Sequence, residues 1–460
     1  MVIISVITIA ISMIICIKKK KFIEWFSVLY VIMPDYFAIE LSQSFPLITG
    51  SRIAIGILIL VLLKKVVLEH KNIILPSNWI IVLCIYASLR IIPNIYYIFT
   101  LTQAINAIFK ILIEQVLLSI LALNVIEKRN DIIQSICYGM GVVSTIGIFE
   151  SIFVVKFSPL FWTVNRTMLD ERYIRLGLLR SVFTFSMPGC FAMFLVVQMP
   201  LVIYMYFFTR KTRYILIANL ALIAVIHSGS RASIVTFFIM ISICFLVIKK
   251  EWRRDYLYKV IISVVCTFGF IFLLSLCSDS LQYYYVGTIK SLLNEIGFRF
   301  NLSAGAPNGV DGYGINGGTG FFSRLFQLSG IEYTLRQHPF VGLGAEAQNR
   351  WAIMYKWIKD WHNYNTYDIG YVAFIGDEGL IGFAGNMFLL IVLVFKCFRN
   401  KKKYMSTEQG FLGICIITYM ICLLFTNGMN KLLWVLICVI IYGDVGLSAK
   451  KITDKQPELE

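Results

Sequence analysis

Apolar residues occur along this chain in runs of roughly 20, separated by short polar segments. A run of that length is what an α-helix needs to cross the hydrocarbon core of a bilayer. The pattern predicts an all-α polytopic membrane protein with about 12 to 13 transmembrane helices. The predicted spans are 1–17, 22–40, 50–67, 78–98, 104–125, 132–155, 181–208, 214–228, 231–248, 257–276, 368–395, 409–427 and 431–447.

Composition supports one integral-membrane domain over residues 1–460. The chain is 58% hydrophobic and 15% charged, which is too apolar for a soluble protein of 460 residues. No small-residue cleavage site follows the first apolar run, so a cleaved signal peptide is not expected. The sequence also shows no internal repeat.

The positive charges predict an orientation. They form short clusters at 18–21, 64–71, 128–129, 210–213, 249–254, 396–403 and 450–451, and an even number of apolar runs separates each pair. The positive-inside rule places these clusters in the cytoplasm, with the N-terminus outside and the tail 446–460 inside. This distribution is typical of cytoplasmic loops, so the net charge of +16 does not indicate nucleic-acid binding.

Two long loops then fall on the outer side, at about 156–180 and at 278–367. The loop 278–367 is the only predicted loop long enough to fold over the bundle as a cap. Its middle, 303–320, is too rich in glycine for a helix and is expected to form a mobile flap.

Arginine is unusually frequent on the predicted outer side, whereas the cytoplasmic clusters favour lysine. The outer arginines are Arg52, Arg90, Arg166, Arg172, Arg175, Arg180, Arg231, Arg299, Arg324, Arg336 and Arg350. Arginine forms planar, bidentate hydrogen bonds to phosphates and carboxylates. This face therefore suits an anionic ligand, although for any single loop arginine, pairing with local acids or outer phospholipids is the favoured explanation. Arg231 differs because it lies between two apolar runs and needs a partner.

The acidic candidates each have a structural alternative. Asp368 begins a predicted helix and would serve either as an N-cap or as a catalytic group. Glu378, inside the same apolar run, is expected to face the bundle interior and either bind substrate or pair with an arginine. The eleven cysteines and four histidines match no metal-ligand spacing, so neither zinc nor disulfides are predicted.

Five motifs occur in a fixed order. Arg180 precedes Phe183-Thr184-Phe185; Ser228-Gly229-Ser230-Arg231 stands at a helix end; Ser323-Arg324-Leu325 lies in the long loop; His338-Pro-Phe-Val-Gly-Leu-Gly344 follows; and Asp368-Ile369 is followed after nine residues by Gly379-Leu-Ile-Gly382. Over roughly 180–390 this order resembles the O-antigen polymerase and O-antigen ligase superfamily of bacterial polysaccharide assembly.

The resemblance implies a metal-independent glycosyltransferase in the cytoplasmic (inner) membrane, with its site facing the outside or periplasm. It would use an undecaprenyl-pyrophosphate-linked oligosaccharide and no nucleotide sugar or other cofactor. A chain-length regulator and a flippase of the same pathway would be its partners, beside membrane lipids. The predicted catalytic residues are Asp368, His362 and Arg231, and the predicted substrate-binding residues are Arg180, Arg324, His338, Glu378 and Arg166.

One departure from the family separates polymerase from ligase. Ligases carry a histidine, then Asn, Ser or Gln, nine residues and Gly-x-x-Gly, whereas here Asp368 occupies the histidine position. His362-Asn363 resembles the first half of that motif but lies too far from Gly379. The aspartate favours a repeat-unit polymerase. A ligase that moves polymer to lipid A–core, a lipid-linked oligosaccharide flippase and a structural subunit are the alternatives.

Overall fold

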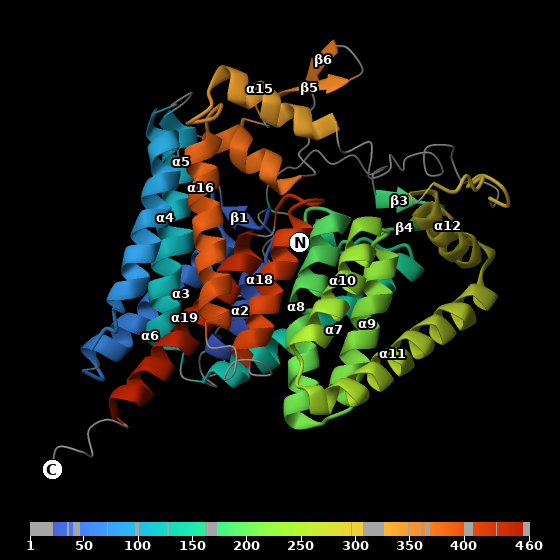
Figure 1. Ribbon diagram of the computed structural model, residues 1–460, viewed down its shortest axis with the longest axis horizontal. Coiled ribbons are helices and arrows are strands. Elements are labelled where there is room, and N and C mark those ends of the chain that lie inside the picture. The colour runs from blue at the N-terminus through green and yellow to red at the C-terminus, as the bar shows by residue number, and fades with distance from the viewer. Residues whose placement is uncertain are drawn as a thin grey trace.

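The computed structural model describes most of the chain. The described residues are 22–34, 36–39, 47–70, 72–96, 101–126, 128–161, 163, 173–295, 297–306, 326–347, 350, 352–357, 360–363, 369–399, 408–428 and 430–453. Within them the chain is mainly helical, and Figure 1 shows the long helices packed side by side with smaller elements beyond one end of the bundle.

The helices follow the apolar runs. They are α2 (Phe22–Ile32), α3 (Gly50–Val67), α4 (Ser77–Tyr96), α5 (Leu101–Ile111), the π-helix η1 (Leu112–Leu117), α6 (Leu118–Val125), α7 (Arg129–Ile152), the 3₁₀ turn η2 (Ser158–Phe161), α8 (Pro188–Thr209), α9 (Arg213–His227), α10 (Arg231–Val247), α11 (Lys250–Cys277), α12 (Asp279–Glu295), the 3₁₀ turn η4 (Phe326–Leu328), α15 (Ser329–Gln337), α16 (Gly370–Phe398), α18 (Glu408–Cys422) and α19 (Asn430–Thr453).

Six helices of the described chain are long and apolar enough to cross a membrane: Ser77–Tyr96, Gln103–Val125, Arg129–Ile152, Pro188–Thr209, Lys250–Cys277 and Gly370–Phe398. Three shorter apolar helices, α9, α10 and α18, accompany them. The predicted helical membrane architecture is confirmed to this extent, and the first predicted span, 1–17, lies outside the described residues. The number of crossings and the side of each loop stay predictions.

Helix α8 forms the centre of the core. It is apolar on all sides, and 83% of its apolar stretch is buried. A helix that is apolar on all sides lies either among other helices or in the hydrocarbon of a membrane, and the burial of α8 shows the first case. Helices α7, α9, α10 and α18 pack around it, and Phe191, Phe194 and Phe411 are among the largest fully buried side chains. By contrast, only 11% of the corresponding stretch of α11 is buried, so α11 lies at the periphery.

The loop predicted at 278–367 contains regular structure that the sequence pattern did not predict. Helix α12 follows α11 directly, and α15 and the hairpin of β5 (Met354–Trp357) and β6 (Asp360–Asn363) precede α16. Two smaller hairpins pair β1 (Ala38–Ile39) with β2 (Ile48–Thr49) and β3 (Ile174–Arg175) with β4 (Leu178–Leu179). Most of the glycine-rich stretch 303–320 lies outside the described residues.

Candidate anion-binding site

Helices α9 and α10 meet in a tight turn formed by Ser228, Gly229, Ser230 and Arg231. Gly229 has φ +60°, a left-handed conformation that favours glycine. The Ser228 hydroxyl donates to the carbonyl of Val225 at 2.6 Å and accepts from the amide of Ser230 at 3.2 Å. The turn is therefore fixed by its own side chain, and it places Arg231 at the first position of α10.

Two further arginines reach this turn from the β3–β4 hairpin. Arg180 Nε donates to the carbonyl of Ser228 at 2.7 Å, and Arg175 Nη1 donates to the carbonyl of Gly229 at 2.8 Å. A Cβ atom on Gly229 would lie 3.2 Å from Arg180 Nε, so the glycine also allows this close approach. We call Arg175, Arg180 and Arg231 the arginine cluster. The hydrogen bonds to Ser228 and Gly229 orient the guanidinium groups of Arg180 and Arg175.

Helix α12 also contacts the turn and the arginine cluster. Arg231 Nη1 donates to Ser291 Oγ at 2.8 Å. Tyr284 OH donates to the carbonyl of Ile226 at 2.7 Å, and Tyr285 OH lies 2.7 Å from His227 Nε2. Figure 1 shows α12 beside β3 and β4, near the ends of α9 and α10.

The pKa of the Tyr284 hydroxyl depends on its burial and on the nearby arginines. Its side chain is fully buried, and burial raises the pKa of Tyr284 to about 12. The positive charges of Arg180 and Arg175 lower that pKa, but by less than burial raises it. The tyrosine is therefore a neutral hydrogen-bond donor beside Arg175 and Arg180, and guanidinium groups are suited to binding an anion.

A second constellation lies where α16 breaks at Gly379. This residue has φ +62° and ψ −160° inside an otherwise helical segment. The turn from His338 to Gly344 packs into the break. The amides of Leu380 and Ile381 donate to the carbonyls of Pro339 and Phe340 at 2.9 and 3.1 Å.

The backbone carbonyl groups before the break also have hydrogen-bond partners in this turn. The amides of Leu343 and Gly344 donate to the carbonyls of Gly376 and Asp377 at 2.8 and 3.0 Å. An interrupted membrane helix needs such partners, because its freed backbone groups otherwise lack hydrogen bonds. The His338–Gly344 turn and the Gly379–Gly382 motif, which are separate in the sequence, are therefore packed together. Backbone hydrogen bonds of the turn hold the two in contact.

Glu378 lies beside this break in a buried ion pair. Its two carboxylate oxygens accept from Arg90 Nε at 2.7 Å and Arg90 Nη2 at 2.6 Å, which joins α16 to α4. Arg90 also donates to Tyr86 OH at 2.6 Å, and Asn94 Nδ2 donates to Glu378 at 3.3 Å. Of the two predicted roles for Glu378, the structure displays the arginine pairing. Figure 1 shows α4 and α16 on the opposite side of the bundle from α12 and β3.

The remaining predicted residues are placed as follows. His362 lies in β6, opposite Tyr355, with an exposed side chain. His338 is the C-cap of α15 and begins the turn that docks onto α16. Asp368, Arg324 and Arg166 lie outside the described residues. Arg180 and Arg231 are thus brought together, whereas Glu378 belongs to a different part of the bundle.

Sequence reasoning counted Arg175 only as one of many outer arginines and did not identify Tyr284 or Arg90 as partners. Arg175 precedes the tight turn Leu176-Gly177, both with positive φ, of 50° and 75°. That turn returns the chain so that Arg180 reaches the same place. Gly177, which lies two residues after Arg175 and three before Arg180, was the feature of the sequence that could have indicated this turn.

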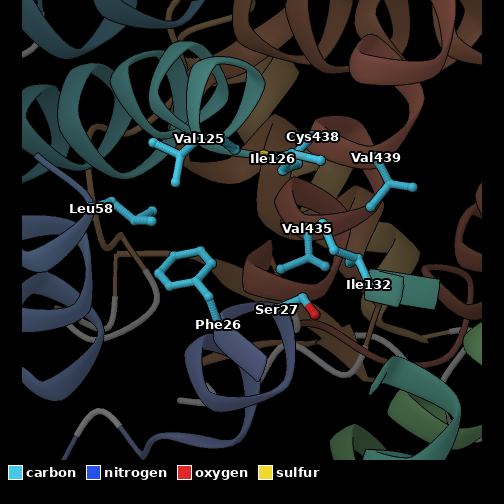
Figure 2. Close-up of a pocket in the computed structure, with 10 residues that line it drawn as sticks. Phe26, Ser27, Leu58, Val125, Ile126, Ile132, Val435, Cys438 and Val439 are labelled. Carbon is cyan, nitrogen blue, oxygen red and sulfur yellow. The ribbon is translucent and has the colours of Figure 1, made fainter. Parts of the chain in front are cut away.

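One small cavity can be set aside as a substrate site. It lies among α2, α3, α6, α7 and α19 and has a volume of about 20 Å³. Its lining is apolar apart from the hydroxyl of Ser27, as Figure 2 shows. A space of this size accommodates roughly one water molecule.

Among the described residues, no three histidine, cysteine, aspartate or glutamate side chains form a group that could hold a metal. No protein-family model matches the sequence, and no curated protein matches it. The resemblance to O-antigen polymerases and ligases therefore rests on the ordered motifs and on the chemistry of the residues that carry them.

Proposed function

We propose that the protein polymerises lipid-linked repeat units of a surface polysaccharide. The observation that carries this proposal is the convergence of Arg175, Arg180 and Arg231 on the Ser228–Arg231 turn. Three guanidinium groups, two from the β3–β4 hairpin and one from the start of α10, suit a ligand with several negative charges, and pyrophosphate is such a ligand. The order of motifs adds the substrate class, because the family that they resemble uses polyprenyl-pyrophosphate donors.

In the proposed reaction, an acceptor hydroxyl oxygen of one lipid-linked unit attacks the anomeric carbon of another. The bond between that carbon and the pyrophosphate oxygen breaks, and lipid pyrophosphate leaves. The arginine cluster, with Arg324, stabilises the charge that grows on the leaving group. The hydroxyl proton passes to Asp368 or to His362. In this proposal, closure of the predicted loop 278–367 would limit hydrolysis of the donor.

A specific observation favours one second candidate, a lipid-linked oligosaccharide flippase. Helix α16 is discontinuous at Gly379 and carries a buried ion pair beside the break. Discontinuous helices and intramembrane charges are common in transporters. Against this candidate, the break is filled by the His338–Gly344 turn, and the chain has no internal repeat.

The glycan phenotype of a deletion strain separates the candidates. A polymerase defect leaves single repeat units on their lipid or on core, and complementation with the intact gene restores long chains. Long polymer retained on undecaprenyl would instead indicate a ligase. Repeat units trapped in the cytoplasm would indicate a flippase. Wild-type glycan in the deletion strain would contradict all three assignments.

A further inference from the structure

A second cavity lies far from the arginine cluster, at the other end of α9 and α10. Its volume is about 70 Å³, roughly half that of the 150 Å³ cavity that holds a benzene molecule. Helices α8, α9, α10 and α11 supply its lining, which is almost entirely apolar and includes Met199, Val202, Phe207, Ala218, Phe237 and Val260.

The exposed face of α11 indicates whether water or lipid lies next to this cavity. Side chains on the outer face of α11, such as Ile261 and Val265, are 60% and 64% exposed. In an apolar helix of 28 residues that is long enough to cross a membrane, this exposed face lies in hydrocarbon. A space between α11 and the bundle is therefore next to acyl chains, and its volume and apolar lining suit a short segment of one.

Lys259 places one positive charge in the otherwise uncharged lining of the cavity. It is the only charged residue in the lining, and it lies nine residues after Lys250, about 14 Å along the helix axis. Within the part of the chain that the structure describes, Lys259 pairs with no carboxylate, since Asp255 one turn earlier pairs with Arg210 at 2.5 Å. Its Nζ lies 6.0 Å from the ring centre of Tyr206 and 5.4 Å from that of Tyr258.

Aromatic and basic residues surround the base of α11. Trp252 stacks on Phe207 with ring centres 5.3 Å apart, and Arg210 lies 5.5 Å from the Trp252 ring. Lys249 lies 5.2 Å from the same ring. Tryptophan and tyrosine concentrate at the headgroup level of membranes, and basic residues there attract anionic lipids. The residues at the start of α11 therefore suit a lipid headgroup, and those that line the cavity suit an acyl chain.

We propose that this cavity binds an anionic glycerophospholipid, with part of one acyl chain between α9 and α11 and the phosphate near Lys259. The lipid class follows from the positive charges of Lys259 and Lys249 and from the apolar lining. The site is separate from the proposed catalytic site, and its test uses lipid binding alone, so either proposal can fail without the other.

Retention of lipid tests the proposal. The full chain is reconstituted in nanodiscs of equal phosphatidylglycerol and phosphatidylcholine, moved to a mild detergent, and examined by native mass spectrometry. Wild type should retain phosphatidylglycerol in preference to phosphatidylcholine. Lys259→Gln should lower that preference roughly fivefold, the factor expected for one lysine near an anionic headgroup. Lys64→Gln, an exposed lysine on α3, should leave it unchanged and serves as the matched control.

A second variant tests the cavity itself. Ala218→Phe places a ring in the lining and should reduce retention of both lipids, whereas Lys259→Gln changes only the preference. Equal retention of the two lipids by wild type, or an unchanged preference in Lys259→Gln, would overturn the proposal. Because Lys259→Gln leaves the packing of the bundle intact, this result stands even where Ala218→Phe does not fold.

Discussion

Replacing Gly379 with alanine tests whether the break in α16 is held by the docked turn. The backbone at Gly379, with φ +62° and ψ −160°, lies in a region that is essentially restricted to glycine, and another residue there costs about 1–3 kcal/mol. An alanine Cβ would also lie 2.4 Å from the amide nitrogen of Gly342 and 2.5 Å from the carbonyl oxygen of Phe340. Both neighbours are backbone atoms, so the turn would have to move.

The two effects add. Overpacking of this kind costs about 1–3 kcal/mol, and displacement of the turn weakens hydrogen bonds worth about 1 kcal/mol each. We therefore expect Gly379→Ala to destabilise the protein by about 3 kcal/mol or more. In detergent, the midpoint of thermal unfolding should fall by at least about 3 °C relative to wild type.

Gly56→Ala on α3 is the matched control. No atom lies within 4 Å of the Cβ that alanine would add there, and the backbone is helical. Alanine in a helix interior is favoured over glycine by roughly 1 kcal/mol, so this variant should be neutral or slightly more stable. Equal unfolding midpoints for Gly379→Ala and Gly56→Ala would refute the docking of the His338–Gly344 turn onto α16.

Three further predictions follow from individual contacts and motifs. Arg90→Met should destabilise the protein by about 3–5 kcal/mol because it leaves Glu378 buried without its cation, and adding Glu378→Met should recover most of that loss in thermal unfolding; a double variant no more stable than Arg90→Met would contradict a purely structural pair. In a glycan ladder assay, Asp368→Asn should insert normally into the membrane yet make only unpolymerised units, and His362→Ala should keep partial function. Wild-type chain lengths from Asp368→Asn would leave helix capping as the role of Asp368. A cysteine at Asn308 should react with an impermeant thiol reagent in intact spheroplasts, after control of the native cysteines, and labelling only after lysis would invert the predicted orientation.

The long apolar helices could be predicted from the sequence because most of them coincide with one continuous apolar run. The predicted span 132–155 corresponds to α7 at 129–152, and 231–248 corresponds to α10 at 231–247. Their ends shift by a few residues because the first and last turns depend on local capping rather than on hydrophobicity. Helix α12 was missed because its tyrosines and polar residues do not form an apolar run of membrane length.

The sites were only partly accessible, for a different reason. The sequence singled out Arg180 and Arg231, but their meeting depends on a hairpin 48 residues upstream of the turn that it contacts. The break at Gly379 depends on carbonyl groups of Pro339 and Phe340, about forty positions earlier, and no local pattern encodes that contact. Likewise, an apolar run around Glu378 indicates that a partner is needed but does not identify Arg90 on a distant helix.

The most direct test of the central claim is polymerisation by purified protein. The wild-type chain, reconstituted in nanodiscs with lipid-pyrophosphate-linked repeat units, should extend them into a ladder and release one lipid pyrophosphate for each bond formed. Arg231→Lys keeps the charge but loses the planar guanidinium, so its rate should fall on the order of a hundredfold at equal protein levels. Absence of both ladder and lipid pyrophosphate from wild type, or a wild-type rate in Arg231→Lys, would contradict the account.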